Sequence, residues 1–283
     1  MAIPLYGSNK AGDKLNEQIQ DEFGIQVVGA GTLTAGRHLY SLGTDYTSAN
    51  PYAESSTQLF PLGARLDWGD RAFVYVEMDG SVTVGKLIQQ TASIVANHSQ
   101  CTATATTAVG QHDVSIETQG DTDLTADLYA GGYLIVNDDG AATGEGQTLR
   151  IKSHPAHDHS DDASVVISCY DPLTTALTTA SELTLTKNPW KDVIVAPAAE
   201  TGAIVGATTI DMTDNYFGWL QVRGPKAMLA GETMVLGHKI CRSDADAGAV
   251  MPDNGDDLTP QLGQVMASTV VDAEYALCFL NIA

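Results

Sequence analysis

The chain has 283 residues, enough for one large domain or two smaller ones that bury a core without disulfides or metals. Only 14 basic residues accompany 35 acidic ones, which gives a formal net charge of −21 at pH 7. So negative a surface repels phosphate backbones and anionic lipids, and we expect neither nucleic acid nor membrane as a partner.

Residues 1–24 are predicted to form an N-terminal arm. Residues 1–12 are extended in this prediction. Asp13 then caps a short helix over residues 14–23, which Gly24 ends. The helix carries one apolar stripe at i, i+4 and i+8. The arm's apolar side chains are the candidates for partner contacts: Ile3, Leu5, Tyr6, Leu15, Ile19 and Phe23.

Glycines in residues 27–36, VVGAGTLTAG, superficially resemble a dinucleotide-binding turn. That fingerprint requires a helix immediately after the glycines, and the threonines that follow here are a poor helix start. We therefore expect no nucleotide cofactor, and the sequence implies no other.

Residues 66–89 and 216–240 are predicted to form two related β-units. In the first, alternation from Phe73 to Met78 leads to Asp79-Gly80, a strong hairpin signal, and a return strand over residues 81–84. In the second, a strand over residues 219–223 is expected to end at Gly224-Pro225, because proline donates no hydrogen bond to a ladder. Both units close on a glycine followed by a short apolar run.

Further short strands are expected between and after these units. Turn residues separate them at intervals of about ten residues, and almost no helix is predicted. The expected strands are residues 133–136, 147–152, 165–170, 182–186, 247–250, 263–266 and 274–281. This pattern predicts an all-β chain of sandwich-like or barrel-like domains. We place the first domain at residues 25–120 and the second at 121–283, or treat both as one unit.

Four cysteines, Cys101, Cys169, Cys241 and Cys278, are widely spaced without a C-x-x-C pair. We expect all four to be reduced and buried or half-buried, as in a protein assembled in a cytosol. The first residues lack a basic and an apolar region, so no secretory signal is expected, nor is a transmembrane segment.

The sharpest chemical cluster is His154, His157 and His159, followed by Asp161 and Asp162. Imidazoles and carboxylates are ligands of zinc-like ions. Pro155 and the small polar neighbours instead favour a solvated loop tip that gains charge below about pH 6.5. We predict no metal site, with these histidines as the candidates if one exists.

No pattern of catalytic residues stands out elsewhere. The acidic runs at residues 244–246 and 253–257 lack the closing glutamate of an EF-hand loop. The chain contains no nucleophile elbow, P-loop or zinc-protease helix motif. We therefore expect a protein that is not an enzyme and has no catalytic residues.

Several segments together resemble virion structural proteins of tailed bacteriophages, especially those of cyanophages and other marine phages. The segments are MA-x-PLYG-x-NK, FPLGAR, GKLIQ, AGGYLIVNDDG, YDPL with SELTLTKNP, YFGWLQVRG and EYALCFLNI. They span most of the chain and are packing and turn motifs. The resemblance implies a capsid decoration or cement protein, often a trimer, and it transfers no functional residue.

Under this resemblance the partners are the major capsid protein and further copies of the chain, a homotrimer. The protein would be made in the host cytoplasm and lie on the capsid exterior, where its charge does not oppose packaged DNA. A tail-tube or baseplate component is an alternative. A glycan-binding or receptor-binding head protein is another, and would require exposed aromatic residues, for which Trp68, Trp190 and Trp219 are the candidates.

Overall fold

The computed structural model describes most of the chain beyond its N-terminal region. The described residues are 37–39 (backbone), 49–91, 96–120, 122–138, 144–253, 255, 260–267 and 270–282. The predicted arm, its helix and the candidate contacts Ile3, Leu5, Tyr6, Leu15, Ile19 and Phe23 lie outside these residues.

The predicted all-β fold class is confirmed. Strands account for 44% of the chain and helix for 1%. Among the described residues the helical element is one 3-10 turn, η1 (Ala96–His98). The chain divides into two compact units, one of which interrupts the other in sequence. Unit 1 comprises Met1–Gln89, Ile194–Ala199 and Ile204–Ala283, and unit 2 comprises Gln90–Val193 and Glu200–Ala203.

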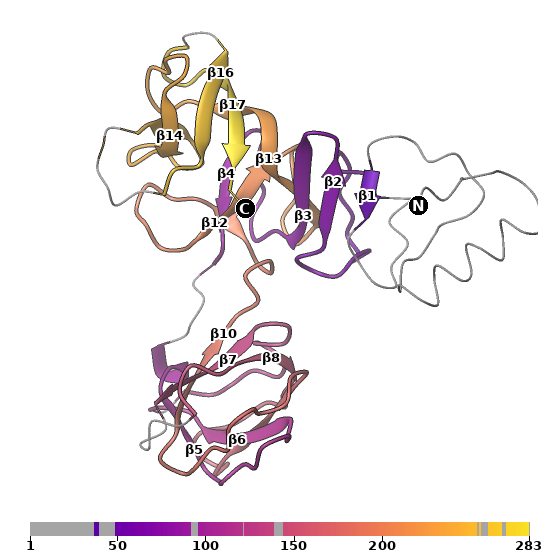
Figure 1. Cartoon of the computed structure of the whole chain (residues 1–283), viewed down its shortest axis with the longest axis vertical. Helices are drawn as coiled ribbons and strands as arrows, with labels where there is room; N and C mark the ends of the chain where they lie inside the picture. The colour runs from indigo at the N-terminus through magenta and orange to yellow at the C-terminus, as the bar shows by residue number, and fades with distance from the viewer. Residues whose placement is uncertain are drawn as a thin grey trace, which may run out of the picture. The chain divides into compact units, whose positions relative to one another are not determined.

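Unit 1 is an eleven-stranded, curled antiparallel sheet (Figure 1). Its main strand order is β1-β2-β3-β13-β17-β16-β14-β15, and β4, β11 and β12 pair off this path. The strands are β1 (Arg37–Leu39), β2 (Arg65–Trp68), β3 (Arg71–Glu77), β4 (Leu87–Gln89), β11 (Ile194–Val195), β12 (Ile204–Thr208), β13 (Phe217–Leu229), β14 (Lys239–Arg242), β15 (Val250–Pro252), β16 (Gly263–Ala267) and β17 (Tyr275–Asn281).

Strand β13 organises this sheet, and it runs for 13 residues without the predicted break at Gly224-Pro225. Its first half pairs with β3 as far as Arg223, and its second half pairs with β17 from Arg223 to Leu229. Pro225 is tolerated because it follows the last pair with β3, so no ladder on that side needs its missing N–H. Figure 1 shows orange β13 between purple β3 and yellow β17.

The predicted hairpin at Asp79-Gly80 is also wrong. Strand β3 pairs with β2 and β13, and the residues after Gly80 do not return along it. Instead Val82 forms an isolated bridge with Met212, and the Gly80 N–H donates to Asp214 (2.7 Å). The tight hairpin of this region joins β2 to β3 through Gly69, whose φ of 65° suits a glycine.

One turn geometry recurs in both units. An isolated bridge residue is followed, three positions later, by a residue with positive φ. The pairs are Val82 and Gly85, Met212 and Asn215, Met234 and Gly237, Val270 and Ala273, Thr107 and Gly110, and Leu124 and Asp127. The similarity of residues 66–89 to residues 216–240 thus reflects a shared local structure.

Unit 2 is a closed six-stranded antiparallel barrel in the order β10-β5-β6-β9-β8-β7. Its strands alternate buried and exposed residues, as in β8, so one face fills the interior. The strands are β5 (Cys101–Ala103), β6 (Asp113–Glu117), β7 (Tyr133–Asp138), β8 (Thr148–Ser153), β9 (Val165–Cys169) and β10 (Glu182–Thr186). Seventeen buried residues, among them Ile116, Tyr129 and Leu185, form its core.

The domain boundary expected near residue 120 falls within this barrel, between β6 and β7. The division between units lies instead near residues 89 and 193. The sequence could not indicate an inserted unit, because short β-strands precede and follow each crossing: β4 and β5 at the first, and β10 and β11 at the second. The pairing of β4 with β11 and β12, and that of β3 with β13, show that segments far apart in sequence share one sheet.

Candidate functional site

The histidine cluster predicted from the sequence belongs to unit 2, and most of it is buried. His154 and His157 are 4% and 2% exposed, whereas His159 is half-buried. The solvated loop tip expected here is therefore wrong for His154 and His157. His157 forms an antiparallel bridge with Leu124, whose side chain is part of the barrel core, and this pairing draws the imidazole inward.

His154 is held by hydrogen bonds at both ring nitrogens. The Tyr129 backbone N–H donates to Nε2 (3.1 Å), and Nδ1 lies 3.0 Å from the Pro155 carbonyl oxygen. Nε2 must accept and Nδ1 must donate, which assigns the neutral Nδ1–H tautomer. His154 thus closes the end of β8 against the Tyr129 turn, and neither nitrogen is available to a metal.

His98, which the sequence pattern did not single out, completes the cluster from η1. It is 1% exposed, and its Nδ1 lies 2.8 Å from the Tyr129 hydroxyl. The two rings meet edge to face at 5.6 Å. The Tyr129 ring is also 6.1 Å from that of His154, so this buried tyrosine contacts both imidazoles. No spacing signal could reveal His98, because it reaches the cluster from more than 50 residues away.

The remaining two histidines differ in their surroundings. His157 Nδ1 lies 3.9 Å from the Asp162 carboxylate, and neither buried ring nitrogen makes a hydrogen bond. His159 Nδ1 lies 3.1 Å from the Thr118 hydroxyl, and the His159 backbone N–H donates to the Asp123 carboxylate. The rings of His157 and His159 are 6.3 Å apart and nearly perpendicular. The three predicted candidates thus lie near one another but do not converge on a common point.

The described residues contain no group of three or more histidine, cysteine, aspartate or glutamate side chains arranged to hold a metal ion. In the histidine cluster, His154 uses both nitrogens within the protein, and His98 uses Nδ1. The arrangement is that of a buried polar network, in which imidazoles and Tyr129 join η1, the Tyr129 turn and the end of β8.

Burial gives this network a pH dependence that can be tested. Burial lowers the pKa of His98 below 6.5. The carbonyls of Thr122 and Asp123 oppose the shift, and the imidazoles of His154 and His157 add to it. Below the pKa that His98 has in the unfolded chain, the unfolded state binds more protons than the folded state. The contribution of His98 to the free energy of unfolding is therefore complete above about pH 6.5, and it is lost as the pH falls through the lower pKa of the folded state.

We expect the free energy of unfolding of unit 2 to fall as pH decreases from 7.5 to 5, and to fall less in His98→Gln. Urea titrations at each pH, followed by hydrogen exchange of unit 2 peptides, measure this. His112→Gln removes an exposed histidine from the same unit and should keep the wild-type profile. Equal slopes for the wild type and H98Q would contradict the assignment to His98.

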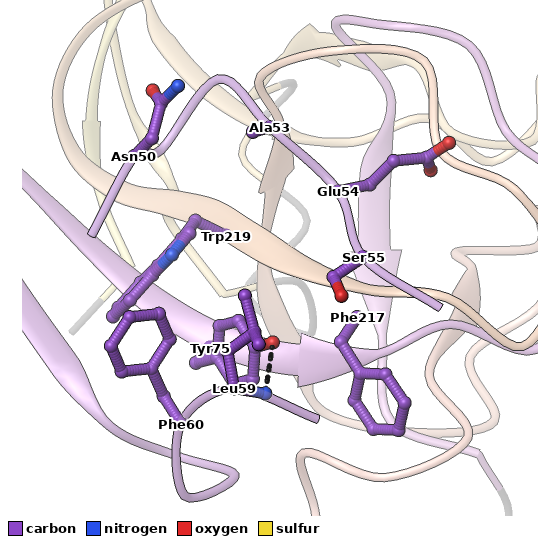
Figure 2. A pocket seen from close by; sticks show the side chains of 9 residues that line it. All are labelled: Asn50, Ala53, Glu54, Ser55, Leu59, Phe60, Tyr75, Phe217 and Trp219. Carbon is purple, nitrogen blue, oxygen red and sulfur yellow. Dashed lines mark hydrogen bonds between the residues drawn. The ribbon is translucent and has the colours of Figure 1, made fainter. Parts of the chain in front are cut away.

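A small aromatic pocket lies in unit 1, between β3, β13 and the segment before β2 (Figure 2). It is lined by Asn50, Ala53, Glu54, Ser55, Leu59, Phe60, Tyr75, Phe217 and Trp219. Phe60, Tyr75 and Trp219 form its floor with ring centroids 5.0–5.4 Å apart, and the Leu59 N–H donates to the Tyr75 hydroxyl (3.2 Å). Burial raises the pKa of Tyr75.

This pocket has a cavity volume of about 60 Å³. Sites for small-molecule ligands typically enclose roughly 300–1,000 Å³. Its one carboxylate, Glu54, already accepts hydrogen bonds from the Thr213 N–H (2.7 Å) and hydroxyl (2.8 Å). The pocket is thus a shallow depression over a packed aromatic cluster, with no free charged group directed at a ligand.

The other reactive side chains are the four buried cysteines and the half-buried Lys226. All four cysteines are free and buried, as predicted, and burial raises the pKa of Cys101 to about 11 and those of Cys169 and Cys278 to about 12. Such thiols are poor nucleophiles. Burial, and then the neighbouring Arg71, lower the pKa of Lys226 to about 8.

The tryptophans considered for sugar stacking are not alike. Trp219 is 2% exposed and belongs to the core, whereas Trp68 and Trp190 are half-buried. Trp68 meets the exposed Tyr52 edge to face at 6.2 Å, and the Arg71 guanidinium lies 5.6 Å from the centroid of the Trp68 ring.

Among the described residues, no helix is both long and apolar enough to cross a membrane.

Comparisons with protein-family models, with curated proteins and with solved structures found no match to this chain.

Proposed function

We propose that this chain is a structural protein of a tailed-phage virion, and specifically a decoration protein. It binds the outer surface of the assembled head and stabilises it by bridging capsomers. It acts by contact and carries out no reaction. This proposal rests on the sequence resemblance together with the two-unit β architecture and the charge of the chain.

The observation that carries the proposal is where the resembling segments lie in the fold. Residues 85–89 end in β4, residues 133–138 form β7, and residues 181–189 include β10. Residues 216–224 and 274–282 supply most of β13 and all of β17. The resemblance therefore concerns the framework of both units, and it supports the proposal as an analogy at the level of the fold.

Charge and mass action supply the physical rationale. A chain of net charge −21 is repelled by packaged DNA, which favours a place outside the shell. A protein that binds only the assembled lattice stabilises it by about 2.7 kcal/mol per site at a free concentration 100 times Kd. The apolar residues of the arm, from Ile3 to Phe23, are the proposed contacts with the major capsid protein.

The test is binding to heads that lack this protein. We expect the purified chain to cosediment with assembled heads and not with unassembled capsid protein, and to raise the temperature at which heads release DNA. Removing residues 1–24 should abolish cosedimentation. Replacing exposed Val166 on β9 by Glu should not.

Localisation in intact particles decides between the alternatives. Density for the chain on the outer head lattice supports the proposal. Stacked rings in the tail would establish the tail-tube or baseplate alternative, and a position against the genome would also contradict decoration. A truncated chain that binds heads as well as the full chain would remove the arm from the mechanism.

A further inference from the structure

Unit 1 presents an apolar sheet face to solvent across β13, β17 and β16. Inward-pointing residues of β17, such as Ala276, Cys278 and Leu280, are fully buried. The alternate residues point outward, and Tyr275 and Leu277 remain 47% and 39% exposed. Strand register places apolar neighbours beside them, and the outward residues of the three strands are Pro225, Ala227, Leu229, Gln264, Met266, Tyr275, Leu277 and Phe279.

This face also has a defined distribution of charge. None of the eight outward residues is acidic, although the chain carries 35 acidic residues. At one end stand two exposed basic residues: Arg223, paired with Asn281, and Lys239, paired with Gln264. At the other end, the turn before β17 carries Asp272 and Glu274, both exposed. The face is therefore basic at one end, apolar in the middle and acidic at the other end.

We propose that this face is the contact between two copies of the chain, packed face to face about a two-fold axis. A two-fold axis that lies between the two sheets, parallel to their planes and perpendicular to β17, places the basic end of one copy over the acidic end of the other. The arrangement is isologous, so each copy contributes both halves of the contact. Sheets packed in this way lie about 10 Å apart with their apolar side chains interdigitated.

Repulsion elsewhere on the surface supports this choice of face. Two copies of net charge −21 repel each other, and a face whose eight outward strand residues include no acid is where they can approach at the lowest electrostatic cost. The seven residues of β17 span about 20 Å, and four strands from β13 to β14 span about 14 Å. An apolar face of that size is smaller than the roughly 800 Å² per partner of a standard interface, so the contact is a reversible one.

This inference rests on the proposed function in one respect. A decoration protein is present in many copies, so contacts between copies are expected. The resemblance implies a trimer, whereas a two-fold contact of this kind forms dimers. A monomer that binds heads would overturn this inference alone. A dimer that fails to bind heads would overturn the proposed function alone.

Sedimentation equilibrium over a range of concentrations tests the contact. We expect a mass approaching twice the 29.8 kDa of one chain, and a reduction of at least about tenfold in the association constant for Leu277→Glu. Leu277 is near the middle of the face, so the two introduced carboxylates would lie close together. The matched control, Val166→Glu on exposed β9 of unit 2, should associate as the wild type does. Circular dichroism verifies that both variants are folded.

A charge exchange tests the orientation. Arg223→Glu should weaken association, and adding Asp272→Lys should restore it, because the two residues face each other across the axis. A monomeric wild type, a trimer, or a dimer unaffected by L277E would each overturn the proposal. Failure of the double variant to recover would overturn the antiparallel orientation.

Discussion

Replacing Gly132 by alanine is expected to destabilise unit 2 by about 3 kcal/mol, because a side chain at this position meets backbone atoms. An added Cβ would lie 2.0 Å from the Thr186 carbonyl oxygen and 2.9 Å from the Asn188 nitrogen. Neither atom can move alone: Thr186 belongs to β10, which pairs with β7 immediately after Gly132. Relief therefore requires the β7–β10 closure of the barrel to shift.

Urea unfolding measures the loss, and hydrogen exchange of peptides from β7 and β10 locates it. Gly146→Ala is the matched control in the same unit, because its Cβ would meet nothing within 4 Å. Gly146 has φ of 79°, so this variant should show only the strain of a left-handed alanine, about 1–2 kcal/mol. Equal losses in the two variants would show that backbone contact at Gly132 is not the cause.

Trp219→Ala should destabilise unit 1 by about 3–5 kcal/mol, the usual range for deleting a buried tryptophan side chain. Trp219 is 2% exposed, and its ring lies 5.0 Å from that of Tyr75 and 5.4 Å from that of Phe60. The variant would leave a cavity beneath the pocket of Figure 2, which the rigid strands β3 and β13 cannot fill.

Chemical denaturation of the variant, with exchange of β3 and β13 peptides, measures this effect. Trp68→Ala serves as the control, because Trp68 is half-buried at the edge of the same cluster and should cost less than half as much. Similar losses in the free energy of unfolding for the two variants would show that the buried Trp219 side chain contributes no more to the stability of unit 1 than the half-buried Trp68.

Several strands were predictable from local patterns. The expected strands at residues 133–136, 147–152, 165–170 and 182–186 correspond to β7 to β10, and that at residues 274–281 to β17. Alternation succeeded here because one face of each strand is buried and the other exposed. It failed at Gly224-Pro225, where the partner of the strand, and not its own residues, decided whether pairing continued.

The histidine cluster, which His98 joins only in the structure, shows the same limit. Three of the four lie within six residues and were visible as a cluster, yet their burial was not. His157 is buried because it bridges Leu124, and His98 joins them through Tyr129. Both contacts connect segments that are distant in sequence. The polar residues around Pro155 suggested a solvated loop. That prediction failed because local polarity carries no information about which distant segments of the barrel cover these histidines.

By itself, the sequence determined the all-β class, the positions of β7 to β10, β16 and β17, the buried free cysteines and several of the glycine turns. Each of these depends on residues that are neighbours along the chain or on the steric freedom of one residue. Tertiary structure alone decided that unit 2 interrupts unit 1, that His98, His154 and His157 are buried together, and that an apolar face remains exposed across β13, β17 and β16. These properties depend on which strands pair, and antiparallel strands of similar length and alternation carry little local information about their partners.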